Sequence, residues 1–214
     1  MITYEGIRLK LRKLYIKFTS KNRRKKIVGD DFTIISNNCW GGTVYQSYGI
    51  EYRSPTIGLF FMAEDYIKFV YDIRLYMNLN LEFIEPSQTK YRNYFKNHNK
   101  FGKYPIGKLG DIEIHFLHYH SEKEAYEKWN RRVKRINWDK MLFKFNDQNL
   151  CTDEHIKKFS ELKVKNKICF TSNKYHYDNV YCIKSLYKYQ NVKASYEPFG
   201  NSQYVDINNL INGL

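Results

Sequence analysis

The sequence contains few cysteines, and their spacing forms no metal or disulfide motif. Its four cysteines are widely separated and include no CxxC pair; they are Cys39, Cys151, Cys169 and Cys182. This spacing provides neither a disulfide framework nor a zinc knuckle, so we expect reduced thiols.

Long hydrophobic runs are also absent: no segment approaches the roughly 18 apolar residues of a membrane-spanning helix, and the N-terminus lacks the apolar core of a signal peptide. We therefore expect a cytoplasmic protein.

Acidic residues are in the minority. The chain has 22 Asp and Glu against 36 Lys and Arg, which gives a formal net charge of +14. A basic surface can bind a polyanion by releasing counterions, but the sequence has no aromatic-basic RNA-binding motif and no zinc finger. We therefore rank nucleic acid last among the partners. An anionic small molecule, such as a nucleotide sugar or acyl-CoA, and an anionic membrane surface rank above it.

The chain is long enough for one sizeable core. With 214 residues and 43% hydrophobic content, we expect a single α/β domain over residues 30–214. Residues 1–29 read as a basic amphipathic helix and a linker. The apolar stripe of this helix consists of Ile7, Leu11, Leu14 and Phe18. Two interpretations stay open: the helix docks on its own domain, which we favour, or it attaches reversibly to an anionic membrane.

Hydrophobic patterns predict alternating strands and helices after residue 30. Strands are expected at 31–36, 56–61, 81–84, 111–116, 141–145, 167–170 and 179–185. Helices are expected at 44–49, 63–78, 121–136, 152–162 and 204–214. Residues 80–104 are polar and tyrosine-rich, which favours an inserted loop or lid. The order of elements predicts a three-layer, Rossmann-like α/β fold, with a mostly parallel sheet and helices on both faces.

One predicted strand has polar residues at every second position. In residues 111–116, Glu113 and His115 alternate with isoleucine and phenylalanine, which indicates a strand with two unlike faces. His118 and His120 follow it. Because His115 points away from the other two histidines, and no further ligand is close in sequence, we predict no metal site. The sequence leaves the identity of any other cofactor open.

The turn that ends the first strand is the predicted functional site. Residues 31–42 read DFTIISNNCWGG, an apolar strand followed by amides, a thiol, an indole and two glycines. Open α/β sheets bind ligands at the carboxyl ends of their strands, so we assign ligand hydrogen bonds to Asn37 and Asn38. Gly41 and Gly42 would let the backbone approach the ligand closely. The spacing matches neither the dinucleotide fingerprint nor the phosphate loop.

Three more strand ends should meet this turn, at residues 118–120, 146–148 and 172–174. The substrate-binding residues that we predict there are Asn37, Asn38, Trp40, Gly41, Gly42, His120, Ser172, Asn173 and Lys174. Stacking on a sugar or base and packing in the core are both open for Trp40.

The predicted catalytic residues are Cys39, His118 and Asp147. His118 or Asp147 would perform acid-base work, and His118 could hydrogen-bond to a ligand or to Asp147. Cys39 would act as a nucleophile with His118 as its base, or it is a small buried side chain beneath Trp40.

Five short motifs are distinctive. They are NNCWGG at 37–42, IGLF at 57–60, YPIG at 104–107, IHFLHY at 114–119 and CFTS at 169–172. Together they resemble a bacterial family often labelled exopolysaccharide biosynthesis protein, over the chain from about residue 30 to its end. The resemblance implies a role in building or modifying cell-surface polysaccharide.

We accordingly expect a transferase that moves an acyl, glycosyl or phosphoryl group from an anionic donor. The chain lacks the Asp-x-Asp pair that many glycosyltransferases use to bind metal, which favours acyl transfer or metal-free sugar transfer. The alternative is a non-catalytic sugar-phosphate-binding or regulatory module that docks on a polysaccharide synthase or on a membrane surface.

Overall fold

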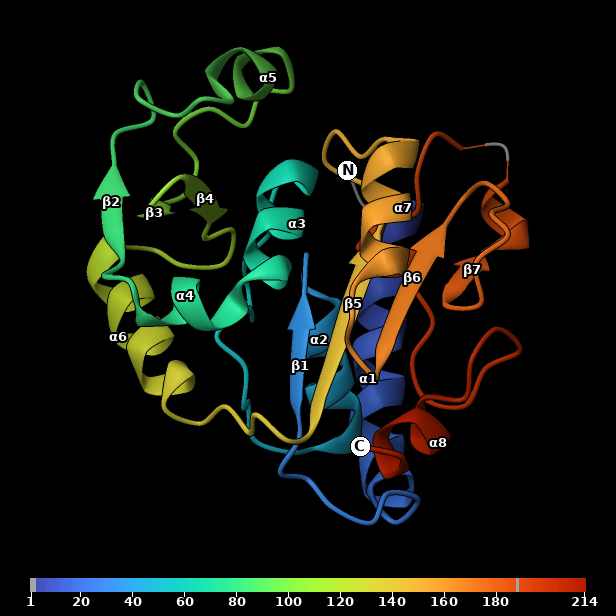
Figure 1. Cartoon of the computed structure of the whole chain (residues 1–214). Helices are drawn as coiled ribbons and strands as arrows, with labels where there is room; N and C mark the ends of the chain where they lie inside the picture. The colour runs from blue at the N-terminus through green and yellow to red at the C-terminus, as the bar shows by residue number, and fades with distance from the viewer. Residues whose placement is uncertain (1–2, 188) are drawn as a thin grey trace.

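The computed structural model describes residues 3–187 and 189–214 (Figure 1). Its helices are α1 (Tyr4–Arg24), α2 (Trp40–Tyr48), α3 (Ala63–Tyr71), α4 (Ile73–Asn78), α5 (Arg92–Asn97), α6 (Glu122–Val133), α7 (Asp153–Glu161) and α8 (Ile207–Asn212), with short 3-10 turns η1 (Lys184–Leu186) and η2 (Ala194–Tyr196). Its strands are β1 (Thr33–Ser36), β2 (Glu82–Ile84), β3 (Ile106–Leu109), β4 (Ile112–His115), β5 (Met141–Asn146), β6 (Lys167–Thr171) and β7 (Val180–Cys182).

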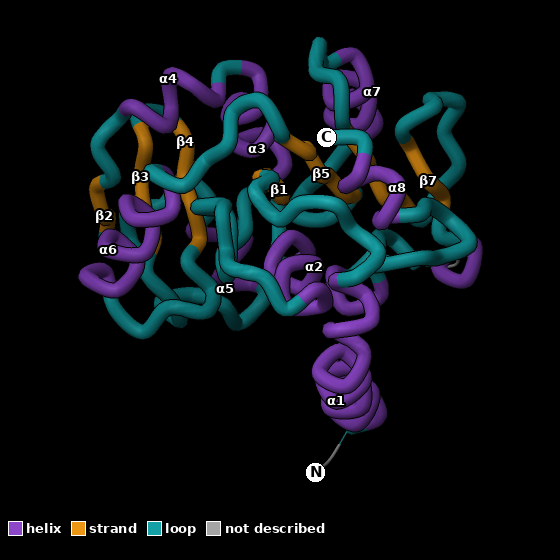
Figure 2. The backbone as a smooth tube through the Cα atoms, turned by 90° about the horizontal axis from the view of Figure 1, so that it is seen from below, coloured by secondary structure: helices purple, strands orange, loops and turns teal. Residues whose placement is uncertain are grey.

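Four strands form a parallel sheet in the order β1-β5-β6-β7. Successive side chains along a strand point to opposite faces, and both faces of this sheet are buried and carry many apolar side chains. Ile35 and Phe143 pack with α3 and α7, whereas Ile34 and Leu142 pack with α2 and α8. Figure 2 shows α7 and α2 on opposite sides of these strands. The predicted α/β class with parallel strands is therefore confirmed for this sheet.

The other three strands form a separate antiparallel sheet in the order β2-β3-β4. The segment 57–62 joins the two sheets: the Phe61 amide donates to the Asn37 carbonyl (3.0 Å), and Phe60 pairs with His115. The strand predicted at 56–61 shrinks to this one bridge, because the chain turns before it and Gly58 has a φ of 77°. The mostly parallel arrangement thus holds for four strands, and the Rossmann-like description stays a prediction.

Two further predicted elements differ from the structure. The helix expected over residues 63–78 breaks at Asp72, where φ and ψ are −135° and 55° and the side chain caps α4 through the Leu75 amide. The polar face expected on residues 111–116 does not exist, since Glu113 and His115 are both buried. One face of this strand packs on the main core through Ile112 and Ile114, and residues 89–95 cover the other face, where Thr89 bonds to Glu113 and Phe95 packs on His115.

Two buried carboxylates fix the segment expected to be a polar insertion. Glu113 accepts hydrogen bonds from the Thr89 hydroxyl and from the Lys90 amide. Asp65 on α3 pairs with the Lys90 ammonium and accepts from the Glu113 amide (3.2 Å). The part of the chain between α4 and β3 is therefore tied to the core by residues from α3 and β4.

Helix α1 is the outermost element on the side of the sheet that α2 covers (Figure 2). It docks through one face, where Ile16 is buried and Arg23 donates to the Ser47 carbonyl (2.8 Å). Its predicted apolar stripe is exposed. The helix thus docks on its own domain, but through its arginine-bearing face and not through the stripe.

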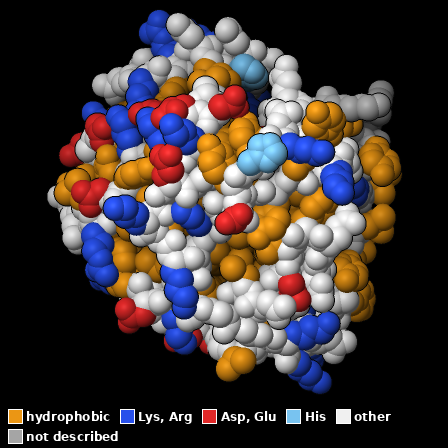
Figure 3. All heavy atoms as spheres, turned by 45° about the vertical axis from the view of Figure 1, so that its right-hand side comes forward, with side chains coloured by type: hydrophobic (Ala, Val, Ile, Leu, Met, Phe, Trp, Pro, Cys, Tyr) orange, Lys and Arg blue, Asp and Glu red, His pale blue; other side chains and the backbone are white. Residues whose placement is uncertain are grey.

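No helix within residues 3–187 and 189–214 combines the length and the apolar character needed to cross a membrane. On the face shown in Figure 3, lysine and arginine side chains are interspersed with acidic and apolar ones. That face carries no single continuous basic patch.

Candidate functional site

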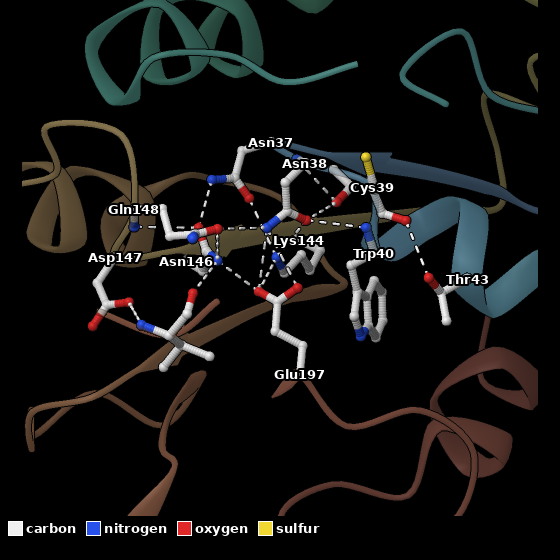
Figure 4. Close-up of polar contacts among 12 residues, drawn as sticks. Asn37, Asn38, Cys39, Trp40, Thr43, Lys144, Asn146, Asp147, Gln148 and Glu197 are labelled. Carbon is white, nitrogen blue, oxygen red and sulfur yellow. Dashed lines mark hydrogen bonds and ion pairs between the residues drawn. The ribbon is translucent and has the colours of Figure 1, made fainter. Parts of the chain in front are cut away.

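A buried polar cluster lies at the carboxyl ends of β1 and β5 (Figure 4). At its centre Lys144 on β5 forms an ion pair with Glu197, and both side chains are fully buried. The Lys144 ammonium also donates to the side-chain oxygens of Asn38 (3.0 Å) and Asn37 (3.3 Å). Asn146 donates to the Glu197 carboxylate at 2.8 Å. The two charges are therefore enclosed by amide groups instead of water.

Burial dominates the electrostatics of the pair. Loss of water lowers the pKa of Lys144 and raises the pKa of Glu197, and the attraction between the two charges opposes both shifts. A pair of this kind persists only where hydrogen bonds replace the lost hydration. The amides of Asn37, Asn38 and Asn146 meet that requirement here.

The pattern of β5 explains how a lysine reaches this position. Leu142, Lys144 and Asn146 alternate with two phenylalanines, so they share the face that α2 covers. The sequence pattern does not single out Lys144, because a lysine within a strand is usually solvated. Glu197 lies beyond η2 in a segment without periodic pattern, so nothing in the sequence could link it to β5.

The structure brings some of the predicted turn residues into the cluster and places others in the core. Asn37 and Asn38 are in the cluster, as described above. Trp40 is fully buried; its indole donates to the Pro198 carbonyl (2.6 Å) and its ring meets Phe170 edge-on. The indole thus packs in the core, and it offers no open face to a sugar.

Gly41 and Gly42 are helical residues of α2, and neither has a positive φ. A Cβ atom at Gly41 would lie 3.3 Å from Ile34, and one at Gly42 would lie 3.3 Å from Ile57. The glycines therefore allow α2 to approach β1 and the segment 57–62. Their expected role, close approach of the backbone to a ligand, stays a prediction.

The structure gives Cys39 no sign of activation. Its sulfur lies 3.9 Å from the Leu59 carbonyl and, in Figure 4, points away from Lys144 and Glu197. Burial, with a smaller contribution from the charge of Glu197, raises the pKa of the thiol to about 11. No histidine forms a hydrogen bond with it among the described residues.

His118 and Asp147 do not form the expected pair. Asp147 instead accepts hydrogen bonds from the Ser172 amide (2.6 Å), the Ser172 hydroxyl (2.8 Å) and the Val192 amide (2.7 Å). The His118 amide donates to the Gly58 carbonyl (2.9 Å). Burial and the charge of Lys13 lower the pKa of the imidazole. Because β4 belongs to the antiparallel sheet, residues 118–120 do not follow a strand of the parallel one.

The remaining predicted residues lie apart from the ion pair. Ser172 is buried against Asp147, whereas Asn173 and Lys174 are exposed. His120 is exposed beside a hollow of about 410 Å³ that Tyr104 and Ser121 also line. Within residues 3–187 and 189–214, no three His, Cys, Asp or Glu side chains are grouped so that they could hold a metal ion.

Comparison with known proteins extends over nearly the whole chain. The family model described as a domain of unknown function (DUF1919) matches residues 10–214, which include the whole buried cluster. An uncharacterized protein of Haemophilus influenzae is 30% identical over 198 residues, which cover 92% of this chain and 89% of that protein. Neither description refers to polysaccharide, so the label carried by the resemblance stays a prediction.

Proposed function

This chain belongs to the family of the domain of unknown function DUF1919, and we propose that it is a transferase of bacterial surface-polysaccharide assembly. It would bind an anionic donor, such as a nucleotide sugar or acyl-CoA, at the carboxyl edge of the parallel sheet. The group moved would be acyl, glycosyl or phosphoryl. The polysaccharide context rests on the resemblance of five motifs. A cytoplasmic location, with peripheral contact at the inner face of the membrane, belongs to the same proposal.

The observation that carries this proposal is the set of hydrogen-bond donors around the Glu197 carboxylate, which we call the cradle. One ammonium, from Lys144, and two amide groups, from Asn38 and Asn146, donate to it. Charge-assisted donors of this kind also recognise the carboxylate or phosphate of a ligand. Glu197 belongs to a segment whose regular structure is limited to η2. A shift of that segment would offer the cradle to an incoming anion in place of the internal carboxylate.

His118 stays the first acid-base candidate under this proposal, and it would act from the segment after β4, outside the carboxyl edge of the parallel sheet. Its imidazole forms no hydrogen bond with the described residues, and its backbone amide donates to Gly58. Burial, with a smaller contribution from the charge of Lys13, lowers the pKa of this imidazole, which favours its neutral form. Asp147 already accepts three hydrogen bonds, which limits it as a second candidate.

The chemistry of Cys39 and Asp147, the other predicted catalytic residues, favours a second, non-catalytic function. The raised pKa of Cys39 and the three hydrogen bonds accepted by Asp147 both disfavour catalysis. These observations support a non-catalytic sugar-phosphate-binding or regulatory module that docks on a polysaccharide synthase. Nucleic acid stays last among the partners, in keeping with the mixed charges of Figure 3.

Thermal-shift measurements with nucleotide sugars, acyl-CoA thioesters and polyprenyl phosphates test the proposal. We expect one class to raise the melting temperature, and the Glu197→Gln variant to bind that class more tightly because the internal competitor is lost. Glu161→Gln, at an exposed position, is the matched control and should bind like the unaltered protein. Product analysis then separates the functions: turnover supports the transferase, whereas stabilisation without turnover supports the module. If no class stabilises either protein, the proposed site is wrong.

A further inference from the structure

The outward face of α1 is apolar along most of its length. Its exposed apolar side chains, with their exposed fractions, are Tyr4 (79%), Ile7 (47%), Leu11 (61%), Leu14 (52%), Tyr15 (56%) and Phe18 (80%). Residues spaced by three and four positions share one helix face, so these side chains form a continuous stripe. A stripe that soluble proteins normally bury marks a surface for interaction when it faces outward.

A row of lysines runs beside this stripe. Lys10, Lys13, Lys17 and Lys21 are exposed and follow the same three- and four-residue spacing. The acidic residue of this helix is Glu5, and its carboxylate accepts a hydrogen bond from Ser195 on the docked side. The outward face of α1 therefore combines apolar side chains with positive charge, and it carries no carboxylate.

The docked face holds α1 in this orientation. Arg8 and Arg12 both donate to the Ser195 carbonyl, at 2.5 Å and 2.6 Å, and Ile16 is buried. The stripe could turn inward only if these contacts broke. A mostly apolar hollow of about 470 Å³ opens beside it, between Leu11 and Tyr15 of α1 and the C-terminal segment.

We infer that the outward face of α1 binds an anionic lipid surface. Its apolar side chains would enter the boundary between headgroups and acyl chains, while the lysines would meet lipid phosphates. A second copy of the chain fits this face less well, because it would bring a second lysine row and no carboxylate against the first. The inference makes no use of Lys144 or Glu197, so it stands or falls separately from the proposed transfer reaction.

Sedimentation of the protein with lipid vesicles tests this inference. We expect binding to vesicles of phosphatidylcholine and phosphatidylglycerol in a two-to-one ratio, and much weaker binding to phosphatidylcholine alone. A triple variant with Lys10→Gln, Lys13→Gln and Lys17→Gln should bind about a hundredfold more weakly, since each basic residue near an anionic surface contributes about a factor of five. The matched control replaces three exposed lysines elsewhere with glutamine, at Lys157, Lys163 and Lys165. Equal losses in the two triple variants, or no binding by the unaltered protein, would overturn the inference.

The stripe itself needs a separate variant. Leu11→Ser with Phe18→Ser should also abolish binding, whereas Leu75→Ser with Tyr126→Ser, two exposed sites outside α1, should not. Circular dichroism checks that each variant keeps its fold, as expected for exposed positions. Light scattering adds the last outcome: if the stripe variant changes the oligomeric state and leaves vesicle binding intact, this face binds a second copy and the inference is wrong.

Discussion

Lys144 and Glu197 form an ion pair with fully buried side chains, although 53 residues separate them in the sequence. The pair joins β5 to the C-terminal segment. The same segment is joined to α1, because Arg12 donates to the Ser195 carbonyl (2.6 Å) and to the Glu197 carbonyl (3.4 Å). The outermost helix and the cluster at the sheet edge therefore lie on opposite sides of one short stretch of chain.

Removing either partner of this pair should lower the free energy of unfolding strongly, and removing both partners should lower it little further. We expect Lys144→Met and Glu197→Gln each to lower the free energy of unfolding by about 3–5 kcal/mol, because each leaves one buried charge without its partner. The double variant should lose much less than the sum of the two. Urea unfolding of all four proteins gives the coupling energy directly. Additive losses would mean that the two side chains do not interact as the structure indicates.

His115 should make stability depend on pH. Burial lowers its pKa from 6.5 to about 3, so the folded protein keeps the imidazole neutral while the unfolded chain protonates it. The contribution of neutral His115 to the free energy of unfolding is complete above pH 6.5, and it is lost progressively as the pH drops toward 3. The loss should be about 1.4 kcal/mol per pH unit within this window, or about 2 kcal/mol at about pH 5.

The matched variant for this prediction is His115→Leu, which keeps an apolar side chain among the aromatic rings of Phe60 and Phe95. Urea unfolding at several pH values should show a shallower decline for the variant than for the unaltered protein. Parallel curves would indicate that His115 is protonated in the folded state.

Much of the fold was predictable, because its local signals are strong. Strands β1, β5 and β6 are short apolar runs, as buried parallel strands usually are. The start of α6 follows from Ser121, whose hydroxyl accepts a hydrogen bond from the Glu124 amide (3.1 Å). Strand β3 was not predicted, since Gly107 and Lys108 interrupt its apolar pattern.

The candidate site was predictable only in part, because some of its residues have a local sequence signal and others are placed by tertiary contacts alone. Asn37 and Asn38 follow directly from the end of an apolar strand, a position that sequence pattern identifies. The histidines were misplaced, because sequence pattern does not say whether β4 pairs in the parallel sheet or elsewhere. Glu197 depends on how the C-terminal segment crosses the sheet edge, which is a tertiary contact without a local signal.

Asp147 should behave as a structural anchor. Its carboxylate accepts hydrogen bonds from Ser172 and Val192, so Asp147→Asn places an amide donor against backbone donors. We expect a loss of about 2–3 kcal/mol in the free energy of unfolding. Asp178→Asn, at an exposed position, serves as the control and should cost little. Unchanged stability combined with lost turnover, once a substrate is found, would instead support the acid-base role predicted for Asp147.

Cys39 should react slowly in the folded protein. A shift of its pKa from 9.0 to about 11 leaves about a hundredfold less thiolate at neutral pH, and thiolate is the form that reacts with alkylating reagents. Alkylation with iodoacetamide, followed by peptide mass spectrometry, should therefore modify Cys39 about a hundredfold faster in urea than in the native protein. Faster reaction in the native protein would mean that a neighbouring group stabilises the thiolate. That result would restore Cys39 as a nucleophile and would make the environment of His118 the first place to look for its base.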